Sequence, residues 1–264
     1  MKTNRWVLSF AAAAMLAACG TTDLENAGDP PELPLEESMI FDTETFPSAG
    51  GGQASGVQRQ VQSGSHHTAA ALGVVGINLA VLAVTSVPRL TWAALATRQP
   101  TFEDGQWHWR GSTSILGVQY SGDLTGYTDD GDVVAEVRIT SPAVSDFLWY
   151  DGRAPIGGNS GQWRVFDASQ PSTPSVVATI DWSRPVSDEW NLTFTALAGN
   201  NPGDELAYDV DGDMRSVTWY DASEDMTYGI RWDAVTREGS ITAAGYNGGQ
   251  MSCWDGDLMN VACS

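Results

Sequence analysis

Three cysteines carry the most reactive side chains of the sequence, and two of them lie close together near its end. Cys253 and Cys263 flank an acidic turn in the stretch CWDGDLMNVAC. This spacing is compatible with a metal clip, a redox pair or a disulfide. The redox state of the compartment in which the protein resides decides between them.

The third cysteine follows an export signal. Lys2 and Arg5 precede the apolar run WVLSFAAAAML, which is too short to span a bilayer. The run ends in LAACG, with the cysteine at position 19, and this ending resembles the lipobox of bacterial lipoproteins. The resemblance covers residues 1–20 and implies a cleaved signal peptide of residues 1–18 and a lipid on the Cys19 thiol. Because Gly20 is not aspartate, it also favours the outer membrane. The alternative is an ordinary secretory signal with a chance cysteine.

If Cys19 carries lipid, the other two cysteines form an even pair in an oxidising envelope compartment. We therefore predict a disulfide between Cys253 and Cys263. Zinc would need four ligands, and no histidine lies nearby in the sequence. We expect neither a metal site nor a cofactor, and we expect the acidic turn between the cysteines to serve chain reversal.

The histidines are few and show no catalytic pattern. His66 and His67 are adjacent, so their side chains diverge on a helix, and solvated or capping roles are expected. His108 alternates with Trp107 and Trp109, which predicts that it lies on the opposite, exposed face of a strand. Asp209 begins an alternating acidic run, but glycine and glutamate are missing at the positions that a calcium loop requires.

Aromatic residues are the remaining candidates for a binding site. Ten tryptophans follow residue 18, and tryptophan with aspartate on a β scaffold is typical of sugar-binding faces. Trp149 precedes Tyr150 and Trp219 precedes Tyr220, so each pair should place one ring inward and one outward. The outward rings are the predicted ligand-binding residues. No acidic pair has a spacing that singles out a glycosidase.

Composition excludes some partners. The formal net charge is −20, and Lys2 is the only lysine, so nucleic acid is not an expected partner. Residues 19–65 are rich in proline, glycine and acids, which predicts a solvated spacer. From Thr68 to Pro88 the chain has no charge, and this length suits either a core helix or a membrane span. We favour a core helix within residues 66–99, broken at Pro88.

Residues 100–264 alternate apolar and polar positions between Asp-Gly and Gly-Gly turns. Trp182, Trp190 and Trp232 fall in phase with aliphatic neighbours and should belong to the core. The pattern predicts a mainly β domain, a strongly curved antiparallel meander or barrel of about 10 to 12 strands with the apolar helix against its concave side. This architecture is similar to that of envelope lipoproteins that carry lipids on a half-barrel.

These observations lead to two functional hypotheses. The first is a non-catalytic lipoprotein, anchored in the cell envelope through its N-terminal lipid, that binds an apolar ligand such as a lipid or an envelope protein. The second is a carbohydrate-binding module or a glycan-active enzyme. Exposed rings beside two facing carboxylates would favour the second.

Overall fold

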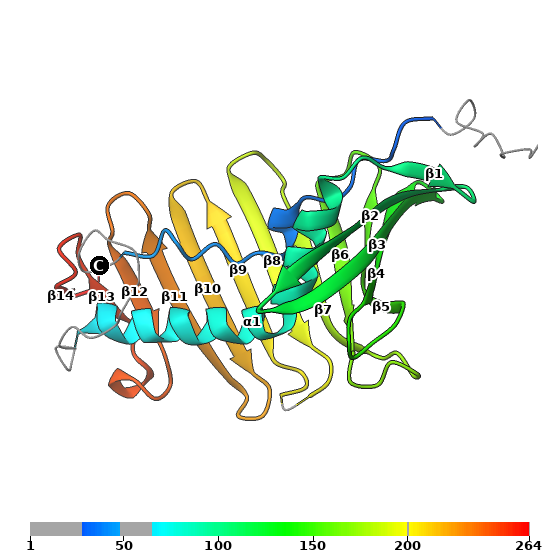
Figure 1. Ribbon diagram of the computed structural model, residues 1–264. Coiled ribbons are helices and arrows are strands. Elements are labelled where there is room, and N and C mark those ends of the chain that lie inside the picture. Colours follow the sequence, from blue (N-terminus) through cyan, green and yellow to red (C-terminus); the bar gives the residue numbers. More distant parts are fainter. Residues whose placement is uncertain (1–27, 48–64, 200, 264) are drawn as a thin grey trace, which may run out of the picture.

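The structure, a computed structural model, describes residues 28–47, 65–199 and 201–263. One antiparallel sheet of 14 strands dominates it, and each strand pairs with its neighbours in the sequence (Figure 1). The mainly β meander is therefore confirmed. In the described residues the sheet runs from β1 to β14 and is not closed into a barrel. Its strand number exceeds the prediction because strands of two to four residues at both ends are too short to show alternation.

The elements follow the chain in simple order. In the part of the chain that the structure describes, two 3-10 helices, η2 (Glu36–Met39) and η3 (Asn247–Gly249), and one α-helix, α1 (His66–Ala96), accompany the sheet. The strands are β1 (Thr101–Glu103), β2 (Gln106–Ile115), β3 (Val118–Asp129), β4 (Asp132–Thr140), β5 (Phe147–Pro155), β6 (Ser160–Phe166), β7 (Val176–Ser183), β8 (Glu189–Ala196), β9 (Glu205–Asp211), β10 (Met214–Asp221), β11 (Met226–Asp233), β12 (Gly239–Thr242), β13 (Ser252–Trp254) and β14 (Asn260–Val261).

Tight turns set the register of the hairpins. Between β3 and β4, Asp130 and Gly131 have φ values of 51° and 89°. Both lie in the left-handed region that a two-residue turn of type I′ requires, which aspartate tolerates and glycine adopts freely. The turn pairs Asp129 with Asp132, and each later pair on the two strands follows from it.

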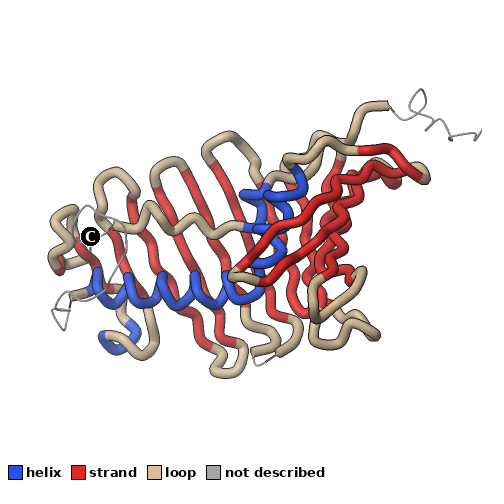
Figure 2. Tube along the Cα trace, viewed as in Figure 1, coloured by secondary structure: helices blue, strands red, loops and turns tan. Residues whose placement is uncertain are grey.

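Helix α1 crosses one face of the sheet, which we call the inner face (Figure 2). Ser65 caps it by accepting a hydrogen bond from the Thr68 amide. The predicted break at Pro88 is wrong, because the helix continues and bends by 63° between Leu82 and Val84. A proline at position 88 cannot donate to the carbonyl of Val84 and its ring pushes against it, so the distortion lies one turn upstream.

Among the described residues no single helix is long and apolar enough to cross a membrane. The halves of α1 pass that test only together, across their bend. Ala70, Val74, Ile77 and Val81 are at most 7% exposed and belong to the core that the helix shares with the sheet. The expected packing of the apolar helix against the sheet is confirmed.

Residues 28–47, which we call the strap, correct the prediction of a solvated spacer. The strap lies on the inner face, where Met39 and Phe41 are 2% and 5% exposed. Acidic residues flank these buried side chains in the sequence. The average composition of the segment therefore predicts a solvated spacer, although part of it packs in the core. The rest of the predicted spacer, 19–27 and 48–64, lies outside the described residues.

The strap and α1 cross the inner face in opposite directions (Figure 1). Along the strap, Ser38 accepts a hydrogen bond from the Trp163 indole on β6, and the carbonyl of Asp42 accepts one from Tyr208 on β9. Phe46 then packs edge-on against Trp232 of β11. The strap and the helix therefore both pack on the inner face of the sheet.

Tryptophans on the inner face pack over glycines of the neighbouring strand. Trp163 lies over Gly152, Trp182 over Gly161, and Trp254 over Gly239. A glycine in a strand interior allows a large ring to approach the backbone closely. Trp182 and Trp232 lie in the core as their phase predicts, while Trp190 is only partly buried.

Candidate functional site

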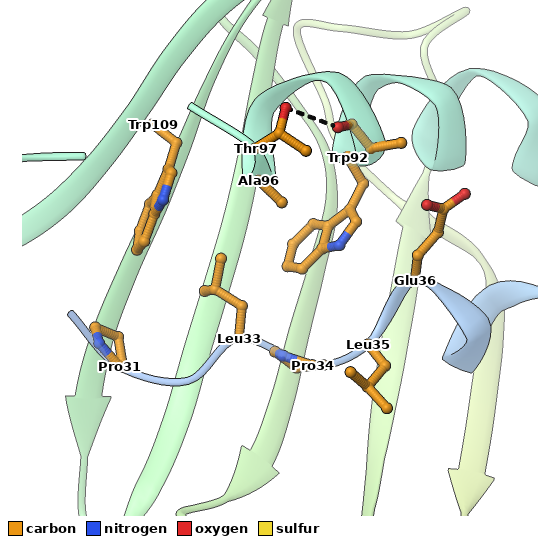
Figure 3. A pocket seen from close by; sticks show the side chains of 10 residues that line it. Pro31, Leu33, Pro34, Leu35, Glu36, Trp92, Ala96, Thr97 and Trp109 are labelled. Carbon is orange, nitrogen blue, oxygen red and sulfur yellow. Dashed lines mark hydrogen bonds between the residues drawn. The ribbon is translucent and has the colours of Figure 1, made fainter. Parts of the chain in front are cut away.

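An open apolar pocket of about 400 Å³ lies between the start of the strap and the end of α1 (Figure 3). The strap forms one wall, the last turns of the helix form the other, and β2 contributes one indole ring. The pocket is lined by Pro31, Leu33, Pro34, Leu35, Glu36, Trp92, Ala93, Ala96, Thr97 and Trp109. Its volume falls within the range of about 300 to 1,000 Å³ that small-molecule sites occupy.

Close backbone packing holds these walls in place. The bend in α1 directs its second half onto β2 and β3, where Leu95 is 1% exposed. A Cβ atom on Gly122 would lie 2.8 Å from a methyl carbon of Leu95, so a larger residue there would displace the Leu95 side chain. On β3, the rings of Trp109 and the side chain of Leu33 share the space above Gly126. The pocket is thus a product of the helix bend and of two glycines on β3.

The pocket offers little for catalysis. Glu36 is its only ionisable lining residue, and its carboxylate lies 3.8 Å from Nε of Arg89. Burial, together with the nearby charge of Glu36, raises the pKa of Tyr150 well above its usual value, so this phenol stays protonated. Two indole rings and aliphatic side chains with one carboxylate favour an apolar chain or ring bearing a single polar group.

A second hollow, of about 600 Å³, lies over β4 to β8 and differs in chemistry. The amide of Gln162 donates to Asp181 at 2.7 Å, and that of Asn191 donates to Ser183 at 3.3 Å. Arg153 also lines it. Such groups suit a ligand rich in hydroxyls. Trp182 is the only aromatic residue in the lining, and it is 7% exposed, so it offers no open ring for stacking.

The aromatic residues predicted as ligand-binding do not meet. Tyr150 is 1% exposed and contacts Trp163, so its ring belongs to the core and not to a ligand surface. It faces inward because it shares the phase of Gly152 on β5. Trp149 lies where the pairing of β4 and β5 shifts register, and its ring contacts Phe147, so it does not lie open on the outer face.

The other predicted pair lies five strands away, on β10. Trp219 stacks on Tyr228 with ring centroids 5.0 Å apart, and its indole donates to Asp204. Tyr220 has the opposite phase and donates its hydroxyl to Asp225 at 3.0 Å. Inward and outward rings therefore alternate here as predicted. They do not join the residues on β5 in one site.

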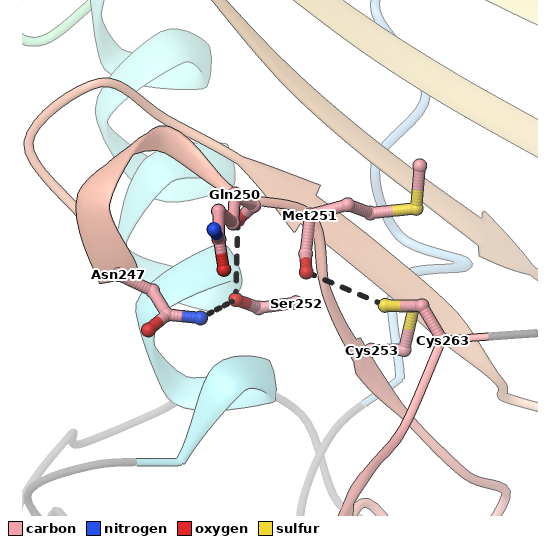
Figure 4. Close-up of a disulfide and its surroundings, with 6 residues drawn as sticks. All are labelled: Asn247, Gln250, Met251, Ser252, Cys253 and Cys263. Atoms are coloured by element: carbon pink, nitrogen blue, oxygen red, sulfur yellow. Dashed lines mark hydrogen bonds between the residues drawn. A yellow bond between two sulfur atoms is a disulfide. The ribbon is translucent and has the colours of Figure 1, made fainter.

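The C-terminal cysteines are joined at disulfide distance, with their Cα atoms 5.2 Å apart (Figure 4). Cys253 lies on β13, and the bridge closes the loop over β14. A side-chain oxygen of Asp255 accepts hydrogen bonds from the amides of Asp257 and Met259, so the acidic turn serves chain reversal. Cys19 lies outside the described residues.

The three histidines contact different groups. His66 opens α1 and lies 2.7 Å from the Tyr246 hydroxyl, while His108 lies on the outer face beside Asp123. His67 is 6% exposed, which corrects the expectation of a solvated or capping side chain; the ring bonds to the Pro47 carbonyl and stacks on Phe46. The described ranges contain no group of three or more histidines, cysteines or acids that could hold a metal ion.

The sequence did not reveal the residues that line the apolar pocket. Leu33 and Leu35 stood within an acidic, proline-rich stretch, and Trp92 stood in a helix without a distinctive motif. Two leucines, one on each side of Pro34, were the available signal. No family model, characterised protein or solved structure matches this chain.

Proposed function

We propose that this chain is a non-catalytic lipoprotein of the cell envelope that binds an apolar ligand in the pocket between the strap and α1. The pocket carries the proposal, because it is open to solvent and Leu33 and Leu35 line it together with the largely buried rings of Trp92 and Trp109. A lipid, or an apolar segment of an envelope protein, is the class of ligand that this lining suits.

The anchor in this proposal is a lipid on Cys19, with the outer membrane as the favoured location. Gly28, the first described residue, is the ninth residue after Cys19, so the span between them is at most about 30 Å when extended. The strap that follows forms a wall of the pocket. The proposed ligand site would therefore lie close to the membrane that holds the protein.

The pocket on the surface replaces the interior of the sheet as the proposed ligand site. The expected lipid carrier would hold its ligand within a half-barrel or barrel. Here the helix and strap occupy that space with Met39, Phe41, Ile77 and other core residues. A closed barrel accordingly has no part in the proposal.

Native mass spectrometry of the chain from Gly20 onward, purified without detergent, tests ligand binding. We expect a fatty acid or lysophospholipid to bind, and Ala96→Phe to weaken binding by about tenfold because the ring would fill the pocket. Ala143→Phe, in an exposed loop, is the matched control and should bind as the original chain does. Absence of any bound lipid, or equal binding by both variants, would rule out the apolar pocket as the site.

A glycan is the second candidate ligand, and the polar hollow over β4 to β8 favours it. Asp181, Gln162 and Asn191 could exchange hydrogen bonds with sugar hydroxyls. A glycan array is the direct test, with Asp181→Asn expected to remove any binding. Silence on the array together with lipid binding would leave the first candidate.

A further inference from the structure

An apolar stripe on the first half of α1 faces away from the sheet and has no partner among the described residues. The stripe consists of Leu72, Val75, Leu79 and Leu82, which are 61%, 53%, 64% and 38% exposed. They follow one another at intervals of three, four and three residues, which places them on one helix face. Other residues of the same helix, on its core-facing side, pack against the sheet. The exposed stripe therefore contributes no packing to the core.

The helix itself carries no charged side chain around the stripe. No charged residue occurs between Thr68 and Pro88, and Gly76 and Ala80 lie exposed between the apolar side chains. A Cβ atom on Gly76 would meet nothing within 4 Å. The stripe exposes on the order of 400 Å² of contiguous apolar surface, which is within the range that marks interaction sites.

Area and position together identify the occupant as a lipid surface. A stable dimer of standard size buries about 800 Å² on each partner, roughly twice what the stripe provides. Ala96 lines the pocket beside the start of the strap. From the rise per residue of an α-helix, Leu79 lies at most about 25 Å from Ala96. The span between Cys19 and Gly28 reaches about 30 Å, so a bilayer that holds the lipid can also meet the stripe.

We propose that the exposed face of α1, from Leu72 to Leu82, rests in the headgroup region of the membrane to which the chain is anchored. The inference rests on the proposed lipid anchor. The net charge of −20 indicates that apolar contact, not attraction to anionic headgroups, holds the face there. One lipid attachment and one apolar helix face would then fix the orientation of the pocket toward the bilayer.

The experiment supplies the anchor artificially, so that it does not depend on acylation of Cys19. The chain from Gly20, with an N-terminal histidine tag, is held on phosphatidylcholine vesicles that contain a nickel-chelating lipid. A nitroxide is placed by Leu79→Cys, with Val235→Cys as the control because Val235 is also exposed, at 68%. On the vesicles, the ratio of oxygen to polar-relaxant accessibility should rise at least about twofold at position 79 and stay constant at position 235.

Three results would overturn the inference. One is an unchanged ratio at position 79 on vesicles that demonstrably hold the protein. Another is equal change at both positions. The third is a dimer in sedimentation without vesicles that Leu79→Ser dissociates, since a second copy would then cover the face. Mass measurement of the N-terminal peptide from cells tests acylation of Cys19 separately, so failure of the anchor and failure of the docking face remain distinguishable.

Discussion

Replacing Gly152 by alanine should destabilise the protein strongly, although it adds one methyl group. A Cβ atom at Gly152 would overlap the six-membered ring of Trp163, which is fully buried. That ring cannot move freely, because it packs against Trp92 with centroids 4.9 Å apart and its N–H donates to Ser38 at 2.7 Å. The glycine therefore secures both the helix and the strap.

The expected loss follows from these contacts. Overpacking a filled core costs about 1 to 3 kcal/mol. Displacing the indole from Ser38 adds about 1 kcal/mol for the lost hydrogen bond. Gly152→Ala should thus lower the free energy of unfolding by about 2 to 4 kcal/mol in urea denaturation. Gly76→Ala, at an open helical position, should raise the free energy of unfolding by about 0.5 to 1 kcal/mol.

A double-mutant cycle tests the cause. In a Trp163→Phe background the overlapping part of the ring is gone, so Gly152→Ala should cost less than about 1 kcal/mol. If the alanine costs the same in both backgrounds, the packing of Trp163 over Gly152 does not explain its effect and the reasoning fails.

Three further expectations concern the C-terminal loop and the strap. Cys253→Ser with Cys263→Ser should lower the free energy of unfolding by about 2.5 to 3 kcal/mol under oxidising conditions, and unchanged thermal stability would reopen the metal question. Burial lowers the pKa of His67 from 6.5, so the folded state binds fewer protons than the unfolded state near that pH. The free energy of unfolding should therefore be highest above about pH 6.5 and fall below it. Denaturation measured at several pH values should show that His67→Phe abolishes this decrease. Phe46→Ala should cost about 2 to 4 kcal/mol in urea by removing ring contacts to His67, and a change below 0.5 kcal/mol would show that the strap adds little.

The strands were predictable because alternation and turn residues act locally. Asp130 and Gly131 mark a hairpin without knowledge of anything distant, and the phase of Trp182 and Trp232 gives their burial. The strap was not predictable in this way. Met39 and Phe41 are isolated among polar residues, and only the sheet they cover makes them core.

The candidate site shows the same division. The adjacent rings of Trp149 and Tyr150 predict one inward and one outward side chain, but the register shift between β4 and β5 changes that simple alternation. The apolar pocket arises from the strap, α1 and β2, which lie far apart in the sequence. Its lining residues share no motif or spacing, since their proximity comes from packing alone.

By itself the sequence determined a mainly β meander, an apolar helix against it and a C-terminal cysteine pair, because these depend on periodicity, local turns and short separations. Only the tertiary structure decided that the strap belongs to the core, that α1 bends before Pro88, and that Leu72 and Leu79 stay exposed while Val74 and Ile77 are buried. A helix that is apolar all round gives no sign of which side the sheet will cover. Packing against the sheet and the strap decides it.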